Sequence, residues 1–166
     1  MSEHILDKIT RRIREEEQDN FERFRADSFQ LEKRPEPVDI LSILEKEFFV
    51  IAEAKKGSPS KGIIREDFRP VEIAVSYRDS GASAISVITE KFFFFGDKVY
   101  LKQVKKAVGL PVLRKDFLVH PYQVYESFNL GADFILLIVA CLSDEELSDL
   151  YRLSKSLGME ALIEVH

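Results

Sequence analysis

From residue 48 onward, short apolar runs alternate with stretches in which apolar residues recur at the spacing of a helix face. Short runs between turn signals are typical of strands, and the recurring pattern is typical of amphipathic helices. Strands are predicted at residues 48–55, 84–89, 111–115, 133–139 and 160–165. Helices are predicted between them, at residues 71–80, 98–108, 121–131 and 144–157. This alternation predicts a parallel α/β fold, either doubly wound or a (β/α) barrel.

Residues at the ends of the predicted helices support these boundaries. Asp97 occupies a capping position before the second of these helices, and Gly109 stands where that helix ends. Ser143, followed three residues later by Glu146, has the pattern of a capping box. His120, just before the third helix, is interpreted as a loop residue.

The amino-terminal region has a helical pattern of its own. Apolar residues recur between charged ones over residues 4–24, which predicts an amphipathic helix. A second, short helix is predicted at residues 39–47, after two prolines that interrupt the chain. We therefore divide the chain into a helical extension at residues 1–47 and an α/β unit at residues 48–166.

Composition and charge narrow the function. A chain of 166 residues, 45% hydrophobic and 32% charged, is typical of one soluble globular domain with a sizeable core. The net charge of −5 and the absence of a basic stripe argue against nucleic acid as a partner. No apolar run approaches the ~20 residues of a membrane span, and residues 1–25 lack the apolar segment of a signal peptide. We therefore expect a cytoplasmic protein without a membrane partner.

Residues that bind metals or cofactors are sparse. Cys141 is the single cysteine, which excludes an internal disulfide and a cysteine cluster, and we interpret it as a small buried hydrophobic residue. Gly57 and Gly62 have the spacing of a phosphate loop, but Ile63 and Ile64 replace the lysine and hydroxyl residue that bind phosphate and magnesium. There is no G-x-G-x-x-G motif. The sequence therefore predicts neither a metal nor a cofactor.

Ionisable residues gather where the predicted strands end. Glu53 and Lys55 project to the same side at the end of the first strand, which we expect to be covered on both faces. Lys115 ends the third strand, and Glu164 ends the fifth, which we expect to be buried. Because the carboxyl ends of parallel strands meet at one edge of a sheet, these groups predict an active site there.

Each of these features also has a structural interpretation. Glu53 and Lys55 could form a structural ion pair. Lys115 could be a surface lysine with an apolar stem, or a general acid or Schiff-base lysine. Glu164 could be a general base if it is buried. The run at residues 92–95, four phenylalanines, could belong to the core or form an aromatic wall for a flat substrate.

Five motifs follow one another along the chain: E-A-K-K-G-S-P-S at 53–60, S-V-I-T-E at 86–90 with F-F-G at 94–96, L-R-K-D-F at 113–117, G-A-D at 131–133 and L-I-E-V at 162–165. In order and spacing they resemble the motifs of the indole-3-glycerol phosphate synthase family. The resemblance implies a TIM (β/α)8 barrel enzyme of tryptophan biosynthesis. Such an enzyme acts on a phosphorylated small molecule, 1-(2-carboxyphenylamino)-1-deoxyribulose 5-phosphate, and closes its indole ring with loss of carbon dioxide and water.

The resemblance also implies roles for individual residues. Lys115 matches the general acid that protonates the ketone oxygen, and Glu164 matches the carboxylate that transfers a proton in the later dehydration. Lys55 matches a lysine that contacts the anionic substrate, and Glu53 matches the acid that holds that lysine. The remaining matches are substrate-binding residues, of which Ser58, Pro59 and Ser60 belong to a closing loop and Phe94, Phe117 and Leu136 surround the aromatic ring.

The chain departs from the family pattern in its number of strands. The family barrel has eight strands, whereas the pattern here predicts the first five after a helical extension, without the later loops that bind phosphate. Open sheet edges would invite association. Two functions are therefore left open: a carboxy-lyase or part of one, and a non-catalytic fragment completed by a carboxyl-terminal half or by self-association. A doubly wound binding module is a third, which the lack of a nucleotide motif disfavours.

Overall fold

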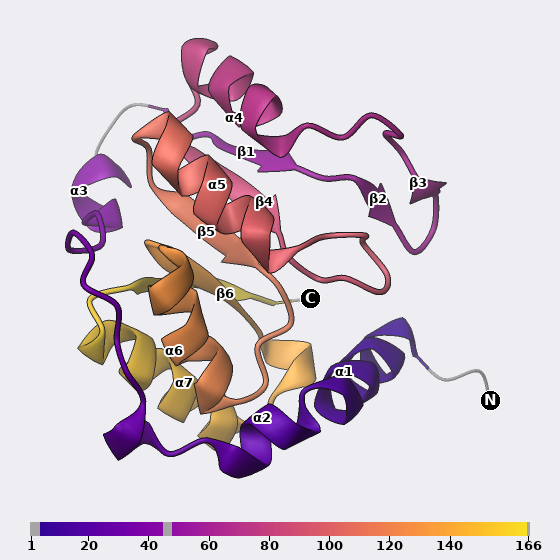
Figure 1. Cartoon of the computed structure of the whole chain (residues 1–166), viewed down its shortest axis with the longest axis vertical. Helices are drawn as coiled ribbons and strands as arrows, with labels where there is room; N and C mark the ends of the chain where they lie inside the picture. Colours follow the sequence, from indigo (N-terminus) through magenta and orange to yellow (C-terminus); the bar gives the residue numbers. More distant parts are fainter. Residues whose placement is uncertain (1–3, 45–47, 166) are drawn as a thin grey trace.

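Five parallel strands form one sheet in the order β1-β4-β5-β6-β7, which is also their order along the chain (Figure 1). This computed structural model describes residues 4–44 and 48–165. The strands of the sheet are β1 (Ile51–Ala54), β4 (Ala84–Ile88), β5 (Val112–Lys115), β6 (Phe134–Ile138) and β7 (Glu160–Glu164). A separate antiparallel hairpin follows β1 and consists of β2 (Gly57–Ser58) and β3 (Gly62–Ile63).

Helices connect the strands of the sheet and precede its first strand. The connecting helices are α4 (Pro70–Asp79), α5 (Lys98–Val108), α6 (Pro121–Leu130) and α7 (Asp144–Ser156). The preceding ones are α1 (Ile5–Glu16), α2 (Gln18–Arg23), the 3-10 turn η1 (Ala26–Ser28) and α3 (Ile40–Leu44), and a second 3-10 turn, η2 (Val139–Cys141), follows β6. Within residues 4–44 and 48–165, no helix has the length and apolar character needed to cross a membrane.

The strand order separates the two arrangements that the sequence left open. In a doubly wound sheet the strand order reverses at a switch point. Here each new strand pairs with the one before it, so the sheet grows in a single direction from β1 to β7. The predicted parallel α/β fold is therefore confirmed, and its winding is that of a partial (β/α) barrel.

Alternation along the strands separates two apolar clusters. Ile85 and Val87 of β4 pack with the helices that connect the strands. Leu113 of β5 belongs to a second cluster with Ile9 and Ile13 of α1. Burying an aliphatic side chain of this size stabilises the fold by roughly 1.5–3 kcal/mol. The helical extension is thus held on the sheet by its own apolar face.

The predicted helix caps are confirmed. Asp97 accepts the N–H of Val99 at 2.9 Å at the start of α5. Ser143 and Glu146 form both hydrogen bonds of a capping box at the start of α7. Gly109 ends α5 in the left-handed conformation (φ 64°), which a residue with a side chain adopts only with strain.

His120 has a more definite role than the loop position assigned from the sequence. Its Nδ1 accepts the N–H of Tyr122 at 3.1 Å, which makes it the amino-terminal cap of α6. Its ring also stacks on Phe21 of α2, with centroids 4.2 Å apart. The prediction did not anticipate this contact because it joins segments far apart in the sequence.

Both edge strands are more exposed than predicted. The first strand is not covered on both faces, since Ile51, Ala52 and Glu53 are only half-buried and Phe48, before the strand, is 78% exposed. The prediction of a buried fifth strand is also wrong, because β7 has exposed residues within it. The physical reason is the same for both: each pairs with a single neighbour in the sheet.

The amino-terminal region forms helices where they were predicted, but the first of them is divided in two. The helix expected over residues 4–24 is divided into α1 and α2 at Glu17, whose backbone leaves the helical region (φ −100°, ψ 7°). The helix expected over residues 39–47 is formed at Ile40–Leu44, and its last predicted residues, 45–47, lie outside the described residues, as does His166.

Asp133, at the amino end of β6, joins three parts of the chain. It is fully buried, and its Oδ1 accepts the N–H of Val38, just before α3, at 2.9 Å. Its Oδ2 accepts the N–H of Val112 of β5 at 2.8 Å and also bonds to the ammonium group of Lys105 of α5. The G-A-D motif therefore has a structural function here.

We expect Asp133→Asn to lower the free energy of unfolding by about 1–3 kcal/mol, because the amide nitrogen would face buried donors. Chemical denaturation measures the change. Asp149→Asn is the matched control, since Asp149 forms an exposed pair with Arg152 and such pairs contribute about 0–1 kcal/mol. Equal losses in the two variants would contradict the role assigned to Asp133.

Candidate active site

A cavity of about 160 Å³ lies at the carboxyl ends of the strands. Residues from β5, β6 and β7, from the loop after β4 and from α1 line it together. Five residues predicted to form the site are among them: Phe94, Lys115, Phe117, Leu136 and Glu164. The structure therefore brings together most of the residues for which the sequence predicted chemistry or ring binding.

Lys115 and Glu164 form the charged part of this cavity. They end β5 and β7, and Nζ of Lys115 lies 3.7 Å from Oε2 of Glu164. Both side chains are about one-third exposed, at 33% and 31%. An ammonium group in this position can donate a proton to a bound substrate, and the neighbouring carboxylate can accept or return one.

Apolar side chains form the other walls. The rings of Phe94 and Phe117 lie 6.1 Å apart at an interplanar angle of 39°. Leu136 and Ile138 of β6 lie between the strands of Lys115 and Glu164 and are buried. The cavity thus combines a flat apolar surface with a charged pair at one side, which suits an aromatic molecule with a polar substituent.

Glu53 and Lys55 meet as predicted, but outside the lining of this cavity. Lys55 Nζ is 3.0 Å from Glu53 Oε1, and both side chains are partly exposed. Glu53 lies in register with Ser86 of β4, whose buried hydroxyl has no hydrogen-bond partner among the described residues. The predicted contact of this pair with a ligand stays a prediction.

The predicted closing loop lies in the β2–β3 hairpin, which extends from the carboxyl end of β1 (Figure 1). The hydroxyls of Ser58 and Ser60 are 3.4 Å apart, and Pro59 and Ser60 are exposed. These three residues do not line the cavity of Lys115 and Glu164. Their predicted contact with substrate remains a prediction.

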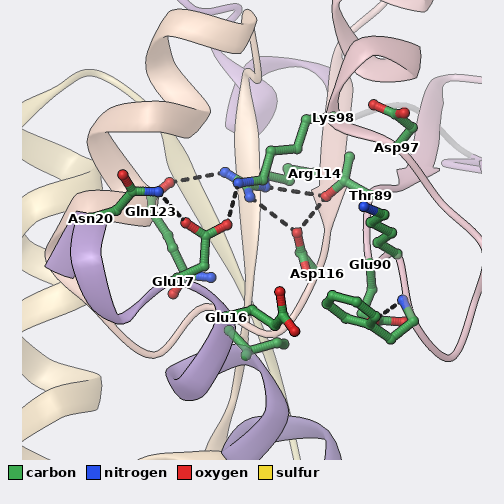
Figure 2. A pocket seen from close by; sticks show the side chains of 13 residues that line it. Glu16, Glu17, Asn20, Thr89, Glu90, Asp97, Lys98, Arg114, Asp116 and Gln123 are labelled. Atoms are coloured by element: carbon green, nitrogen blue, oxygen red, sulfur yellow. Dashed lines mark hydrogen bonds and ion pairs between the residues drawn. The ribbon is translucent and has the colours of Figure 1, made fainter.

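A second, larger cavity of about 370 Å³ lies between the strand ends and the helices α1 and α2, and sequence reasoning missed it. Figure 2 shows charged side chains from both sides gathered around Arg114. Arg114 is fully buried and donates hydrogen bonds to Thr89, Asp116, Ser127 and the carbonyl of Gln123. Its ion pair with Glu126 is 2.9 Å long.

This network continues to the helical extension. Lys98 Nζ lies 2.7 Å from Glu17 and 2.9 Å from Glu126, so it connects the junction of α1 and α2 with α6. Burial opposes ionisation of Glu17, but hydrogen bonds from Lys98 and Asn20 outweigh it and lower the pKa of that carboxyl. One signal in the sequence could have indicated this network. Side chains alternate in direction along a strand, which predicts that Arg114 faces away from Lys115.

Glu90 belongs to the motif at 86–90 but was given no role from the sequence, and it lines both cavities. Its side chain is almost completely buried, and its carboxylate accepts three backbone N–H groups of the loop that follows. Burial raises the pKa of Glu90, although the three backbone hydrogen bonds favour the ionised carboxylate.

No cluster of His, Cys, Asp and Glu among the described residues could hold a metal ion.

A parallel sheet wound in one direction, with a lysine and a carboxylate at its strand ends, defines a (β/α)-barrel protein with a strand-end site. The family model described as indole-3-glycerol phosphate synthase matches residues 2–166, and the chain belongs to that family. A protein named indole-3-glycerol phosphate synthase from Sulfurimonas denitrificans is 48% identical over 170 residues. A protein of the same name from Aliarcobacter butzleri is 45% identical over 169 residues. Each comparison covers 98% of this chain and 64% of the relative, so the chain spans less than two thirds of their length.

Cys141 provides a chemical probe of the site. Burial, together with the negative charges of Glu164 and Asp7, raises the pKa of its thiol to about 11. The fraction of reactive thiolate at pH 8 should therefore be about a hundredfold below that of an ordinary cysteine. Alkylation by iodoacetamide should accelerate steadily up to about pH 11.

Glu164→Gln should increase the alkylation rate of Cys141 at pH 8, because it removes a nearby negative charge. Glu160→Gln, at the other end of β7, is the matched control and should leave the rate unchanged. A rate that levels off near pH 9 would contradict the half-buried, negatively charged surroundings of this thiol.

Proposed function

We propose that this chain supplies the lysine–glutamate pair and the aromatic wall of an indole-3-glycerol phosphate synthase active site. The observation that carries the proposal is the position of Lys115 and Glu164, 3.7 Å apart in a cavity that Phe94 and Phe117 also line. Membership of the family and the relatives' names support the reaction. The substrate would be the phosphorylated molecule 1-(2-carboxyphenylamino)-1-deoxyribulose 5-phosphate.

In this proposal the phenyl ring of the substrate lies against Phe94 and Phe117. Lys115 donates a proton to the ketone oxygen as the ring carbon that bears the carboxylate attacks the ketone carbon. The carbon–carboxylate bond then breaks, and its electrons restore the ring as carbon dioxide leaves. Glu164 transfers protons in the last step, in which the new hydroxyl leaves as water and the indole double bond forms.

The remaining contacts belong to the proposal as well. Lys55, held by Glu53 at 3.0 Å, would attract the anionic substrate, and Ser58, Pro59 and Ser60 would close over it. We place this function in the cytoplasm, in keeping with a soluble biosynthetic enzyme. Phosphate binding would come from strands that pair with the two open edges of the sheet.

The open edges favour a second candidate, a fragment that requires a partner to be complete. Leu162 and Ile163 of β7 are 42% and 44% exposed, and Phe48 and Val50 before β1 are more exposed still. Unpaired strand edges with apolar side chains associate with other strands. Either a complementing segment or a second copy of the chain would cover them.

Lys115→Ala tests the proposed chemistry. We expect kcat for indole-3-glycerol phosphate formation, followed by fluorescence, to fall by roughly 10²–10⁴-fold, because a general acid contributes about that factor. KM should change little, since the cavity walls remain. The assay uses the chain mixed with the carboxyl-terminal third of the Sulfurimonas relative. Lys102→Ala, at an exposed pair on α5, is the control and should keep full activity. A loss below tenfold for Lys115→Ala would rule out its role as general acid.

The chain alone should self-associate and should turn over substrate only at the background rate. Without strands beside β1 and β7, remote binding energy cannot orient the reacting ring. Analytical ultracentrifugation should show concentration-dependent oligomers that Ile163→Lys reduces. Val99→Lys, at a comparably exposed position on α5, should not reduce them. A stable monomer that turns over substrate unaided would disprove this prediction.

A further inference from the structure

The loop after β4 is folded around the side chain of Glu90. One carboxylate oxygen accepts the N–H of Phe92 at 2.7 Å, and the other accepts those of Phe93 and Phe94 at 2.7 and 2.8 Å. The backbone carbonyl of Glu90 also accepts the N–H of Gly96 at 2.7 Å. A single residue therefore binds both ends of the loop.

The backbone of this loop is held in a conformation that few residues adopt without support. Phe95 has φ 58° and is the one residue other than glycine with positive φ among those described. A β-carbon at Gly96 would lie 2.5 Å from the carbonyl oxygen of Ile88. The hydrogen bonds to Glu90 compensate the cost of such a conformation, which is about 1–3 kcal/mol per residue.

The folded loop distributes its four phenylalanines among three neighbours. Phe92 lies under the guanidinium of Arg12 of α1 at 4.7 Å, and Phe93 faces Lys8 of the same helix. Phe94 lines the cavity of Lys115 and contributes the ring that faces Phe117.

Phe95 contacts the third neighbour, the β2–β3 hairpin. Its ring lies directly against Gly57, where a β-carbon would be only 2.5 Å from the Cδ2 atom of the ring. Gly57 begins the hairpin that contains Ser58 and Ser60. The position of that hairpin therefore depends on the conformation that Glu90 imposes on Phe95.

We infer that Glu90 is a positioning residue that holds Phe94 as the wall of the aromatic site and Phe95 as the support of the β2–β3 hairpin. This inference rests on the proposed function for the identity of the bound ring, but the folding of the loop around Glu90 is independent of it. Glu90 does not need to contact the substrate, because both of its carboxylate oxygens accept hydrogen bonds from backbone N–H groups. Its effect is on affinity for the ring.

The test compares Glu90→Gln with the unmodified chain by two measurements, each chain being mixed with the carboxyl-terminal third of the Sulfurimonas relative. Amide hydrogen exchange should be at least about tenfold faster at Phe92, Phe93 and Phe94, because an amide side chain cannot accept all three hydrogen bonds. Exchange at Ile135, in the middle of β6, should not change. Affinity for anthranilate, followed by its fluorescence, should fall by about tenfold.

Two further variants distinguish the effect of the loop conformation from the effect of the Phe94 ring. Phe94→Ala should weaken anthranilate binding to a similar extent while the amides of Phe92 and Phe93 stay protected. Glu146→Gln is the matched control, since its carboxylate also accepts a backbone N–H but outside the site, and it should alter neither measurement at the site. If Glu90→Gln does not fold, Glu90→Asp replaces it, because the shorter side chain cannot reach all three N–H groups.

The outcomes are distinct. Faster exchange together with weaker binding supports the positioning role. Unchanged exchange in the loop overturns it, and so does faster exchange with unchanged affinity for anthranilate. If the unmodified chain does not bind anthranilate in this mixture, the proposed function fails, and the exchange data alone then decide whether Glu90 holds the loop.

Discussion

The buried guanidinium of Arg114 is the group on which the geometry of the strand ends depends. A charge that is fully buried is tolerated only when its hydrogen-bonding groups are satisfied, and here Asp116 and Glu126 neutralise it. Arg114 of β5 and Asp116, just after β5, flank Lys115, so their contacts with α6 and Thr89 fix the backbone on both sides of the lysine. Loss of one partner of such a pair typically costs about 3–5 kcal/mol, so the network constrains the site strongly.

Much of the fold was predictable because its signals are local. Helix ends such as the Ser143 capping box depend on residues close in sequence, and apolar runs identify strands without knowledge of their neighbours. The exposure of β1 and β7 was not predictable, since burial of a strand depends on what pairs with it. The division of the chain at residue 47 stays a prediction.

The candidate site was predictable where chemistry and position coincide. Lys115 and Glu164 are ionisable groups at strand ends, and the parallel sheet brought them together. Glu90 and Arg114 escaped prediction because their importance comes from partners such as backbone amides and Glu126, which only the folded structure identifies. The roles of Glu53 and Lys55 beyond their mutual contact stay predictions for the same reason.

The alternation within L-R-K-D-F limits how the length of β5 can vary. Lys115 and Phe117 line the smaller cavity and Arg114 lines the larger one, whereas Asp116, just after β5, borders both. A shift of one residue in a strand exchanges its two faces. Insertion of one residue within β5 would therefore turn Arg114 toward the aromatic cavity. The same insertion would turn Lys115 toward the helices. Loops on either side can change length, but these four residues form a segment whose spacing is fixed from both faces of the sheet.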